Sequence, residues 1–224
     1  MRVYTHPAST TSRIVMMFAA EEAPEIEFKT VDIFSGEHMK PPYAKLNPSC
    51  QVPMLEDGDF RLTESSAILK YLADKKKSPS YPQGLRERAR VNELMDWFNT
   101  QFYRDFAYGL VYPQGFPTHK RRSDEAQAAT LAWGKERAEA WLKVLDQHHL
   151  GPTRAFVCGD KLTIADYLGG EMVAVGELIR CGFDGLPNVQ RWLKNLKALK
   201  SWPKVHEVFY GFAGSLKDAK FEAF

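Results

Sequence analysis

A segment rich in proline, serine and glycine divides the chain into two parts with different hydrophobic patterns. The segment reads KSPSYPQG over residues 77–84, a composition typical of linkers. Before this segment, short apolar runs alternate with stretches in which apolar residues have helical spacing. After it, every clear repeat of apolar residues has helical spacing. For a chain of 224 residues, we therefore expect two domains: an α/β domain over residues 1–76 and an all-helical domain over residues 85–224.

The elements of the first part follow the order β-α-β and then β-β-α. Apolar runs predict strands near Val3 and Tyr4 and over residues 26–33, 52–56 and 60–62. Helical periods predict helices over residues 12–22 and 65–76. Asp57 and Gly58 separate the last two strands, and this dipeptide between apolar runs is a strong hairpin signal.

The second part contains no convincing strand. Its periods predict helices over residues 85–110, 123–148, 163–180, 188–198 and 201–210. Thr163 and Asp166 have the spacing of a capping box, in which each side chain bonds to the backbone N–H of the other residue. We interpret this pair as a folding signal rather than as a site with a catalytic acid.

Composition and charge exclude several classes of protein. The formal net charge of +2 carries no signature of a dedicated nucleic-acid or membrane binder. The three cysteines, Cys50, Cys158 and Cys181, are widely spaced and form no C-x-x-C motif, which argues against a disulfide framework or a zinc site. No signal peptide and no run of about 18 apolar residues is evident. We expect a cytoplasmic protein without a bound metal.

Three motifs in the first part resemble those of cytosolic glutathione transferases that use a serine, the theta class and its bacterial relatives. Residues 6–13, HPASTTSR, resemble the theta-type HPASQPCR or LLSQPCR signature. Residues 47–53, NPSCQVP, are similar to the family's N-P-x-x-x-V-P loop, and residues 62–72, LTESSAILKYL, to its L-T-E-S-x-A-I-L-x-Y-L segment. Their order and spacing, together with DGDF at residues 57–60, make the match specific. The resemblance implies a thioredoxin-like domain with a mixed four-stranded sheet, followed by a helical domain.

By this resemblance, Ser9 is the catalytic residue, whose hydroxyl stabilises the thiolate of glutathione. A free thiol has a pKa of about 8.5, so a donor near the start of a helix favours its charged form. Thr10 and Ser12 are the alternative donors, and each is also a plausible helix-capping residue. No paired base and no G-x-S-x-G elbow mark Ser9 as a covalent nucleophile. His6 precedes a proline, and the sequence is compatible with either a structural or a functional role for it.

The resemblance also assigns a set of residues to glutathione binding. Val52 and Pro53 present their backbone to the cysteinyl moiety, and the bond before Pro53 is expected to be cis. Glu64 and Ser65 open a helix whose free N–H groups suit the γ-glutamyl end. The full set is Thr10, His38, Gln51, Val52, Pro53, Glu64 and Ser65. His38 is assigned to the glycyl carboxylate together with Gln51, or with Lys40 as the alternative.

The electrophile is expected between the two domains, against an apolar wall. Tyr108, Tyr112 and Phe116 belong to an aromatic-rich stretch of the second part, and we assign them to this pocket. Most aromatic residues at helical spacing belong to the hydrophobic core, and these three residues are also open to that interpretation. Phe209, Tyr210 and Phe212 near the end of the chain are candidates for a cover.

The sequence thus predicts a glutathione transferase that activates glutathione for attack on a small hydrophobic or halogenated electrophile. Glutathione is then a cosubstrate, no cofactor is bound, and the resemblance implies a homodimer. A glutathione-dependent lyase, isomerase or reductase on the same scaffold is an alternative. A non-enzymatic, transferase-like interaction module is another.

Overall fold

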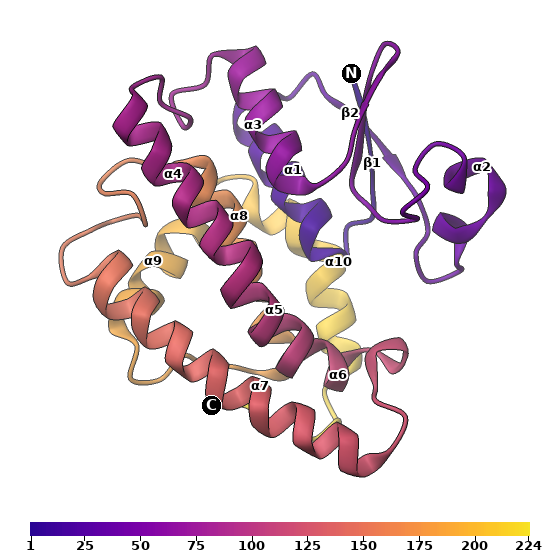
Figure 1. The fold of residues 1–224 in the computed structure, drawn as a ribbon, viewed down its shortest axis with the longest axis vertical. Helices are drawn as coiled ribbons and strands as arrows, with labels where there is room; N and C mark the ends of the chain where they lie inside the picture. Colours follow the sequence, from indigo (N-terminus) through magenta and orange to yellow (C-terminus); the bar gives the residue numbers. More distant parts are fainter.

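The computed structural model describes residues 1–224 without a break, and its N-terminal part is built on a four-stranded sheet (Figure 1). The strand order is β2-β1-β3-β4, with β1 parallel to β2 and antiparallel to β3, and β3 antiparallel to β4. The elements are β1 (Arg2–Thr5), α1 (Thr10–Glu22), β2 (Glu27–Thr30), η1 (Glu37–Met39), α2 (Pro41–Ala44), β3 (Met54–Asp57), β4 (Phe60–Leu62) and α3 (Ser65–Lys76). This is the mixed sheet that the resemblance implies.

Alternate residues of the central strands face opposite sides of the sheet. Val3 of β1 and Leu55 of β3 pack into the main core, where α1 and α3 cover the sheet. Tyr4 and Met54 point to the other side and form a small cluster with Tyr43 of α2. Because side chains alternate along a strand, one apolar run supplies both layers.

Some element bounds differ from the predicted ones. The turn between β3 and β4 consists of Gly58 and Asp59, one residue later than the predicted Asp57–Gly58 pair, because Asp57 still pairs with Phe60. Gly58 has a φ of 64°, a conformation that glycine adopts at little cost. The predicted strand over residues 26–33 is confined to Glu27–Thr30.

The C-terminal part is entirely helical, as predicted. It contains α4 (Leu85–Trp97), η2 (Phe98–Phe102), α5 (Tyr103–Phe106), η3 (Ala107–Val111), α6 (Tyr112–Gly115), η4 (Pro117–His119), α7 (Asp124–Val144), η5 (Leu145–Leu150), α8 (Ile164–Ala174), η6 (Val175–Ile179), α9 (Pro187–Lys197) and α10 (Trp202–Ser215). The elements from α4 to α6 follow one another without a break, and η2 and η3 are π-helical turns within them.

A close helix crossing fixes this long helical stretch against α7. A Cβ atom on Gly134 of α7 would lie 2.4 Å from the backbone carbonyl of Gly109 in η3. The two backbones therefore touch at a point where no side chain larger than hydrogen fits, and this contact sets where the residues after Gly109 lie.

The two parts share one hydrophobic core. α1 packs against α8 and α10, and α3 packs against α8, so α1 and α3 lie between the sheet and the C-terminal helices (Figure 1). The capping box is present: the amide and hydroxyl of Thr163 both donate to Asp166, each at 2.8 Å. None of the helices has the length and the apolar composition needed to cross a bilayer.

Candidate functional site

The strand directions bring three loops together at one edge of the sheet. The carboxyl ends of β1 and β4 lie beside the amino end of β3, because β3 is antiparallel to both neighbours. The loop after β1 contains Ser9, the loop before β3 contains Val52, and the loop after β4 contains Glu64. Residues that are far apart in the sequence thus form one candidate site.

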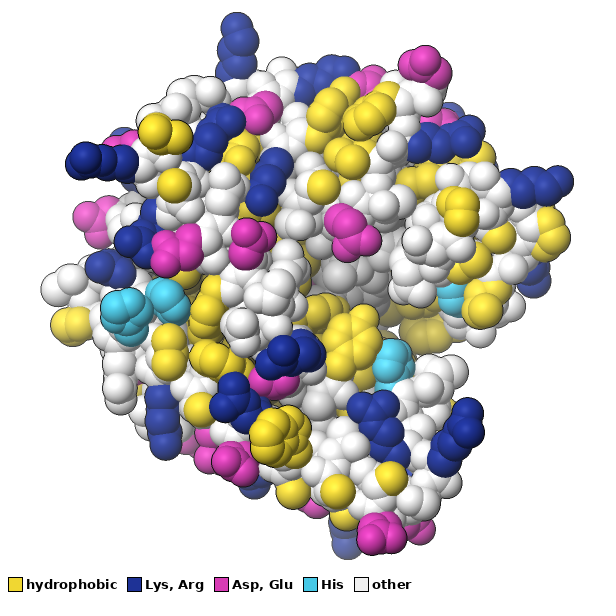
Figure 2. Space-filling model, viewed as in Figure 1, with side chains coloured by type: hydrophobic (Ala, Val, Ile, Leu, Met, Phe, Trp, Pro, Cys, Tyr) yellow, Lys and Arg dark blue, Asp and Glu magenta, His cyan; other side chains and the backbone are white.

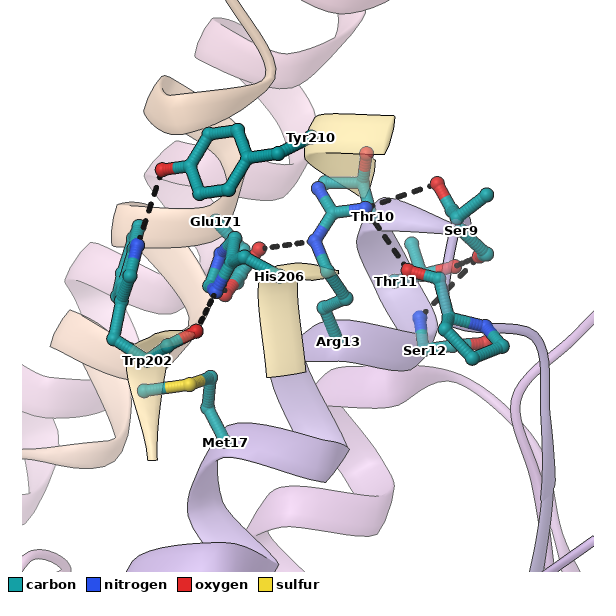
Figure 3. Close-up of polar contacts among 12 residues, drawn as sticks. Ser9, Thr10, Thr11, Ser12, Arg13, Met17, Glu171, Trp202, His206 and Tyr210 are labelled. Atoms are coloured by element: carbon teal, nitrogen blue, oxygen red, sulfur yellow. Dashed lines mark hydrogen bonds and ion pairs between the residues drawn. The ribbon is translucent and has the colours of Figure 1, made fainter. Parts of the chain in front are cut away.

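Ser9 is the N-cap residue of α1 and is partly exposed. Its Oγ accepts a hydrogen bond from the N–H of Ser12 at 3.3 Å and lies 3.1 Å from Oγ1 of Thr11 (Figure 3). The N-terminus of a helix carries a partial positive charge from its free N–H groups. An anion beside Ser9 would therefore meet both a hydroxyl donor and a favourable helix dipole.

The hydroxyls of Thr10 and Ser12 are buried and already engaged. Oγ1 of Thr10 accepts a hydrogen bond from the hydroxyl of Tyr112 at 3.0 Å. Oγ of Ser12 accepts from the backbone N–H of His6 at 3.2 Å. Of the three candidate donors, Ser9 alone is partly exposed.

His6 and Arg13 hold the loop that carries Ser9. Nδ1 of His6 accepts a hydrogen bond from the N–H of Ala8 at 3.2 Å, so this nitrogen carries no proton. Burial lowers the pKa of His6, against an opposing effect of the Asp32 carboxylate. Nη1 of Arg13 donates to the carbonyl oxygen of Ala8 at 2.9 Å. His6 therefore has a structural role in this turn.

The loop before β3 is fixed by hydrogen bonds to its carbonyl groups. The Val52–Pro53 peptide bond is cis, as the resemblance implies. The carbonyl oxygen of Gln51 accepts from the Tyr43 hydroxyl at 2.6 Å and from Nδ2 of Asn47 at 2.7 Å. The side chain of Gln51 is exposed.

The start of α3 combines a strained residue with free donors. Glu64, its N-cap residue, has φ 64° and ψ 114°, a conformation that costs a non-glycine residue about 1–3 kcal/mol. No side chain caps the helix, so the N–H groups of its first turn remain available to an anion. Ser65, the first residue of α3, is buried. Such strain beside unused donors is a feature of ligand sites.

His38 lies on η1, between β2 and β3. Its side chain has no hydrogen-bond partner. Its Nδ1 is buried without a partner. A buried polar atom in this state is uncommon, and a ligand group or a water molecule can supply the missing partner.

An aromatic group extends from the helical part toward the loop after β2. Ring centroids lie 5.0 Å apart for Tyr108 and Tyr112, 5.4 Å for Tyr112 and Phe116, 5.3 Å for Phe116 and Phe212, and 5.6 Å for Phe212 and Phe34. Figure 2 shows a hollow between the lobe that carries α2 and the end of the molecule that carries α6. The aromatic group connects these two regions.

The members of this group differ in exposure. Tyr108 is 45% exposed, whereas Tyr112 is 8% exposed and its hydroxyl bonds to Thr10 and Tyr103. Burial raises the pKa of Tyr112 to about 12, so its hydroxyl stays protonated at neutral pH. Burial and the Glu64 carboxylate raise the pKa of Tyr108.

Of the three residues expected to cover the site, only Phe212 contacts the aromatic group. Phe212 of α10 stacks on Phe116. Phe209 is buried in the core, where the Arg13 guanidinium lies 4.1 Å from its ring centroid. Tyr210 bonds through its hydroxyl to the indole N–H of Trp202 at 3.1 Å. The expectation for Phe209 and Tyr210 is wrong, because α10 directs them toward α1 and toward its own first turn.

Three features of the site were not predicted from the sequence. They are the place of Phe34 in the aromatic group, the stacking of Phe212 on Phe116, and the contact of Thr11 with the loop before β3. The Thr11 hydroxyl donates to the carbonyl oxygen of Val52 at 2.9 Å. The four consecutive hydroxyl residues 9–12 were a signal that this stretch is rich in donors. Which hydroxyl meets which partner depends on the fold of the loop before β3.

Comparisons with known proteins agree with this arrangement. The family description "Glutathione S-transferase, N-terminal domain" matches residues 1–74, and "Glutathione S-transferase, C-terminal domain" matches residues 114–200. The second match begins within the long helical stretch, so it includes Phe116 but not Tyr108 or Tyr112.

Theta-class proteins are among the relatives. Glutathione S-transferase theta-1 from Homo sapiens is 34% identical over 221 residues, which cover 93% of this chain and 88% of the relative. The structure of human glutathione transferase theta-2 in complex with glutathione and an unknown ligand aligns with a TM-score of 0.83 at 27% identity, covering 100% of this chain and 93% of that one. The apo form of human glutathione S-transferase T1-1 aligns with a TM-score of 0.76 at 30% identity, covering 97% and 96%. The chain therefore belongs to the glutathione S-transferase family, as a theta-like member.

Proposed function

We propose that Ser9 activates the thiol of glutathione by donating a hydrogen bond to its thiolate. Family membership makes the chain an enzyme that transfers glutathione to electrophiles, with glutathione as a cosubstrate. The observation that carries the assignment of Ser9 is its exposure: Thr10 and Ser12 are buried and accept hydrogen bonds from Tyr112 and His6.

The energetics of this step are modest. Lowering a thiol pKa from about 8.5 by two units requires about 2.7 kcal/mol of preferential stabilisation of the thiolate. A hydrogen bond to a charged group contributes about 1.5–3 kcal/mol, and the N-terminus of α1 adds about 0.3–1 kcal/mol. One hydroxyl and one helix end are therefore sufficient.

The remaining contacts follow the chemistry of the tripeptide. Val52 and Pro53 pair through their backbone with the cysteinyl moiety. The free N–H groups of Ser65 and the following turn bind the γ-glutamyl carboxylate, and the exposed carboxylate of Glu64 binds the ammonium group. The open donors of α3 and the strained conformation of Glu64 support this assignment.

Three further residues complete the proposed glutathione site. The unpartnered Nδ1 of His38 supports a contact with the glycyl carboxylate. The exposed side chain of Gln51 is free to make a second one. Thr10 contributes its backbone N–H in the first turn of α1, since its hydroxyl oxygen already accepts from Tyr112.

The electrophile binds against the aromatic group, on Tyr108, Tyr112 and Phe116. Their apolar faces suit a small hydrophobic or halogenated carbon compound. The partial exposure of Tyr108 and Phe116 supports direct contact for these two residues. Tyr112 lies between them and forms the floor of the pocket.

We further propose the domain boundaries, the oligomeric state and the cellular location of the enzyme. Its domains are residues 1–76 and 85–224, with residues 77–84 as the linker. The proposed homodimer rests on membership of the glutathione S-transferase family. The three unpaired cysteines are compatible with the cytoplasm.

The test is a pH titration of enzyme-bound glutathione, in which the ultraviolet absorbance of the thiolate is followed. We expect the wild-type enzyme to lower the pKa of the bound thiol below its value in water. Ser9→Ala should raise that pKa by about one to two units, which corresponds to the loss of about 1.5–3 kcal/mol. Thr10→Val is the matched control and should leave the pKa of the bound thiol unchanged.

Other outcomes would reassign the role. A raised thiol pKa in Thr10→Val but not in Ser9→Ala would make Thr10 the donor. Failure of immobilised glutathione to retain the wild-type protein would favour the interaction module.

A further inference from the structure

A chain of hydroxyl groups connects the start of α1 to the loop before β3. The Thr11 hydroxyl donates to the Val52 carbonyl oxygen at 2.9 Å, and its Oγ1 lies 3.1 Å from Oγ of Ser9. Oγ of Ser9 also accepts from the N–H of Ser12 at 3.3 Å. Figure 3 shows Ser9, Thr11 and Ser12 side by side at the end of the helix. Thr11 stands where the relatives' signature has proline, a residue without a hydroxyl.

The hydrogen atoms in this chain can be assigned one by one. A hydroxyl has a single hydrogen and accepts through its oxygen, and a carbonyl oxygen only accepts. The Thr11 hydrogen therefore points to Val52, and the hydrogen between Ser9 and Thr11 belongs to Ser9. Without a ligand, the hydrogen that Ser9 needs for thiol activation is directed to Thr11.

Binding of the tripeptide changes both ends of the chain. The cysteinyl N–H of glutathione supplies a new donor to the Val52 carbonyl oxygen, and the sulfur supplies an acceptor for the Ser9 hydrogen. The Thr11 hydrogen can then turn toward Ser9 without leaving the Val52 carbonyl oxygen unpaired, and the contact between Ser9 and Thr11 is kept with Thr11 as its donor. A hydroxyl that accepts a hydrogen bond becomes a stronger donor, because bonds in a chain polarise one another.

We propose that Thr11 is a positioning residue that couples backbone pairing of the tripeptide at Val52 to thiol activation by Ser9. The Thr11 hydrogen points to Val52 in the free enzyme and to Ser9 in the complex. This inference rests on the proposed function, in which Ser9 is the thiolate donor and Val52 pairs with the cysteinyl moiety.

The experiment compares Thr11→Val, which keeps the shape of the side chain without the hydroxyl, with Thr11→Ser, which keeps the hydroxyl. Thr11→Ala is a second hydroxyl-free variant for the case that valine disturbs the loop. We expect Thr11→Val and Thr11→Ala to lower kcat/KM by about three- to tenfold near pH 6.5, the equivalent of one ordinary hydrogen bond. Thr11→Ser should restore activity to within about twofold of wild type.

Two readouts separate positioning from a simple structural role. Affinity for S-methylglutathione, which has no thiol, should change less than about threefold in the hydroxyl-free variants, whereas the pKa of bound glutathione should rise. In a Ser9→Ala background, Thr11→Val should have almost no further effect, because Thr11 acts through Ser9.

The inference is overturned if Thr11→Val retains full activity, or if its effect is equally large with and without Ser9. It is also overturned if S-methylglutathione affinity falls as much as kcat/KM, because Thr11 would then merely hold the loop. Failure of Ser9→Ala to raise the pKa of the bound thiol would instead contradict the proposed function itself.

Discussion

Nε of Arg13 in α1 lies 2.8 Å from Oε2 of Glu171 in α8, with both side chains almost completely buried. The other carboxylate oxygen of Glu171 lies 2.9 Å from Nε2 of His206 in α10. Nδ1 of His206 donates to the carbonyl oxygen of Trp202 at 2.9 Å, since a carbonyl only accepts. These contacts tie three helices together beside the turn that carries Ser9 (Figure 3).

Loss of the Glu171 charge should be strongly destabilising. Burial disfavours the charged form of this residue, but Arg13 and His206 outweigh that effect and lower the pKa of Glu171. Glu171→Gln leaves the Arg13 guanidinium buried without a counter-charge, and we expect a loss of about 3–5 kcal/mol in the free energy of unfolding. Urea unfolding at pH 7 measures this loss.

Glu177→Gln is the matched control. Glu177 forms an ion pair with Lys197 at 2.6 Å, but both side chains are partly exposed, so this pair contributes about 0–1 kcal/mol. Equal losses for the two variants would contradict the role of the buried network.

Asp166 anchors the loop before α8 through four donors. Oδ1 accepts from the N–H of Val157 at 2.8 Å and from the indole of Trp192 at 2.9 Å, and Oδ2 accepts from the amide and hydroxyl of Thr163. Asp166→Asn puts an NH2 group against two of these donors, and we expect a loss of about 2–4 kcal/mol of stability. The thermal unfolding midpoint should fall clearly, whereas Asp160→Asn on the exposed surface should leave it almost unchanged.

Tyr112→Phe tests whether the Tyr112 hydroxyl serves structure rather than catalysis. The variant removes the donor to buried Thr10 and the partner of the Tyr103 hydroxyl. We expect about 1–3 kcal/mol less stability, because buried polar atoms lose their partners. The KM for the electrophile should change by less than about twofold, because the ring remains in place. Tyr108→Phe, at an exposed ring, is the control and should not change stability.

His149 should weaken the fold at acidic pH. Burial and the neighbouring His148 lower its pKa from 6.5 to about 4. Between these two values the unfolded chain binds more protons than the folded one, so stability falls as pH decreases from about 6.5 to about 4. The free energy of unfolding, measured by urea at several pH values, should fall less steeply in His149→Gln than in the wild type.

His148→Gln is the comparison for this titration, because His148 is exposed. Its curve should lie closer to that of the wild type than the His149→Gln curve does, because burial, the larger cause of the low His149 pKa, remains. A wild-type slope that His149→Gln leaves unchanged would assign the acid sensitivity to other groups.

Local signals in the sequence predicted the elements well because they depend on short stretches of chain. The Thr163–Asp166 pair is three residues apart, and its capping box forms as predicted. The hairpin between β3 and β4 was predicted from Asp57 and Gly58, although the register of the sheet moves the turn by one residue. Most helix ends in the C-terminal part lie close to the predicted ones. The stretch from α4 continues through α6 to Gly115, and α10 continues to Ser215, both beyond the predicted ends at residues 110 and 210.

The sequence alone could not decide which of the neighbouring hydroxyl residues is exposed. Ser9, Thr10 and Ser12 are of similar chemistry and lie within four positions. Their different burial depends on Tyr112, which is 102 positions from Thr10, and on the turn at His6. Thr11 likewise meets Val52 across 41 positions.

By itself, the sequence determined the order of the four strands and the longer helices and the motifs of the glutathione S-transferase family, because period, turn chemistry and capping are properties of contiguous residues. The short helices η1 and α2 between β2 and β3 were not predicted. Only the tertiary structure decided that Ser9 is the partly exposed hydroxyl, that Phe212 rather than Phe209 reaches the aromatic group, and that Glu171 neutralises Arg13. Arg13 and Glu171 are 158 positions apart, and Phe116 and Phe212 are also distant in the sequence. Packing of α1, α8 and α10 against one another sets these relationships.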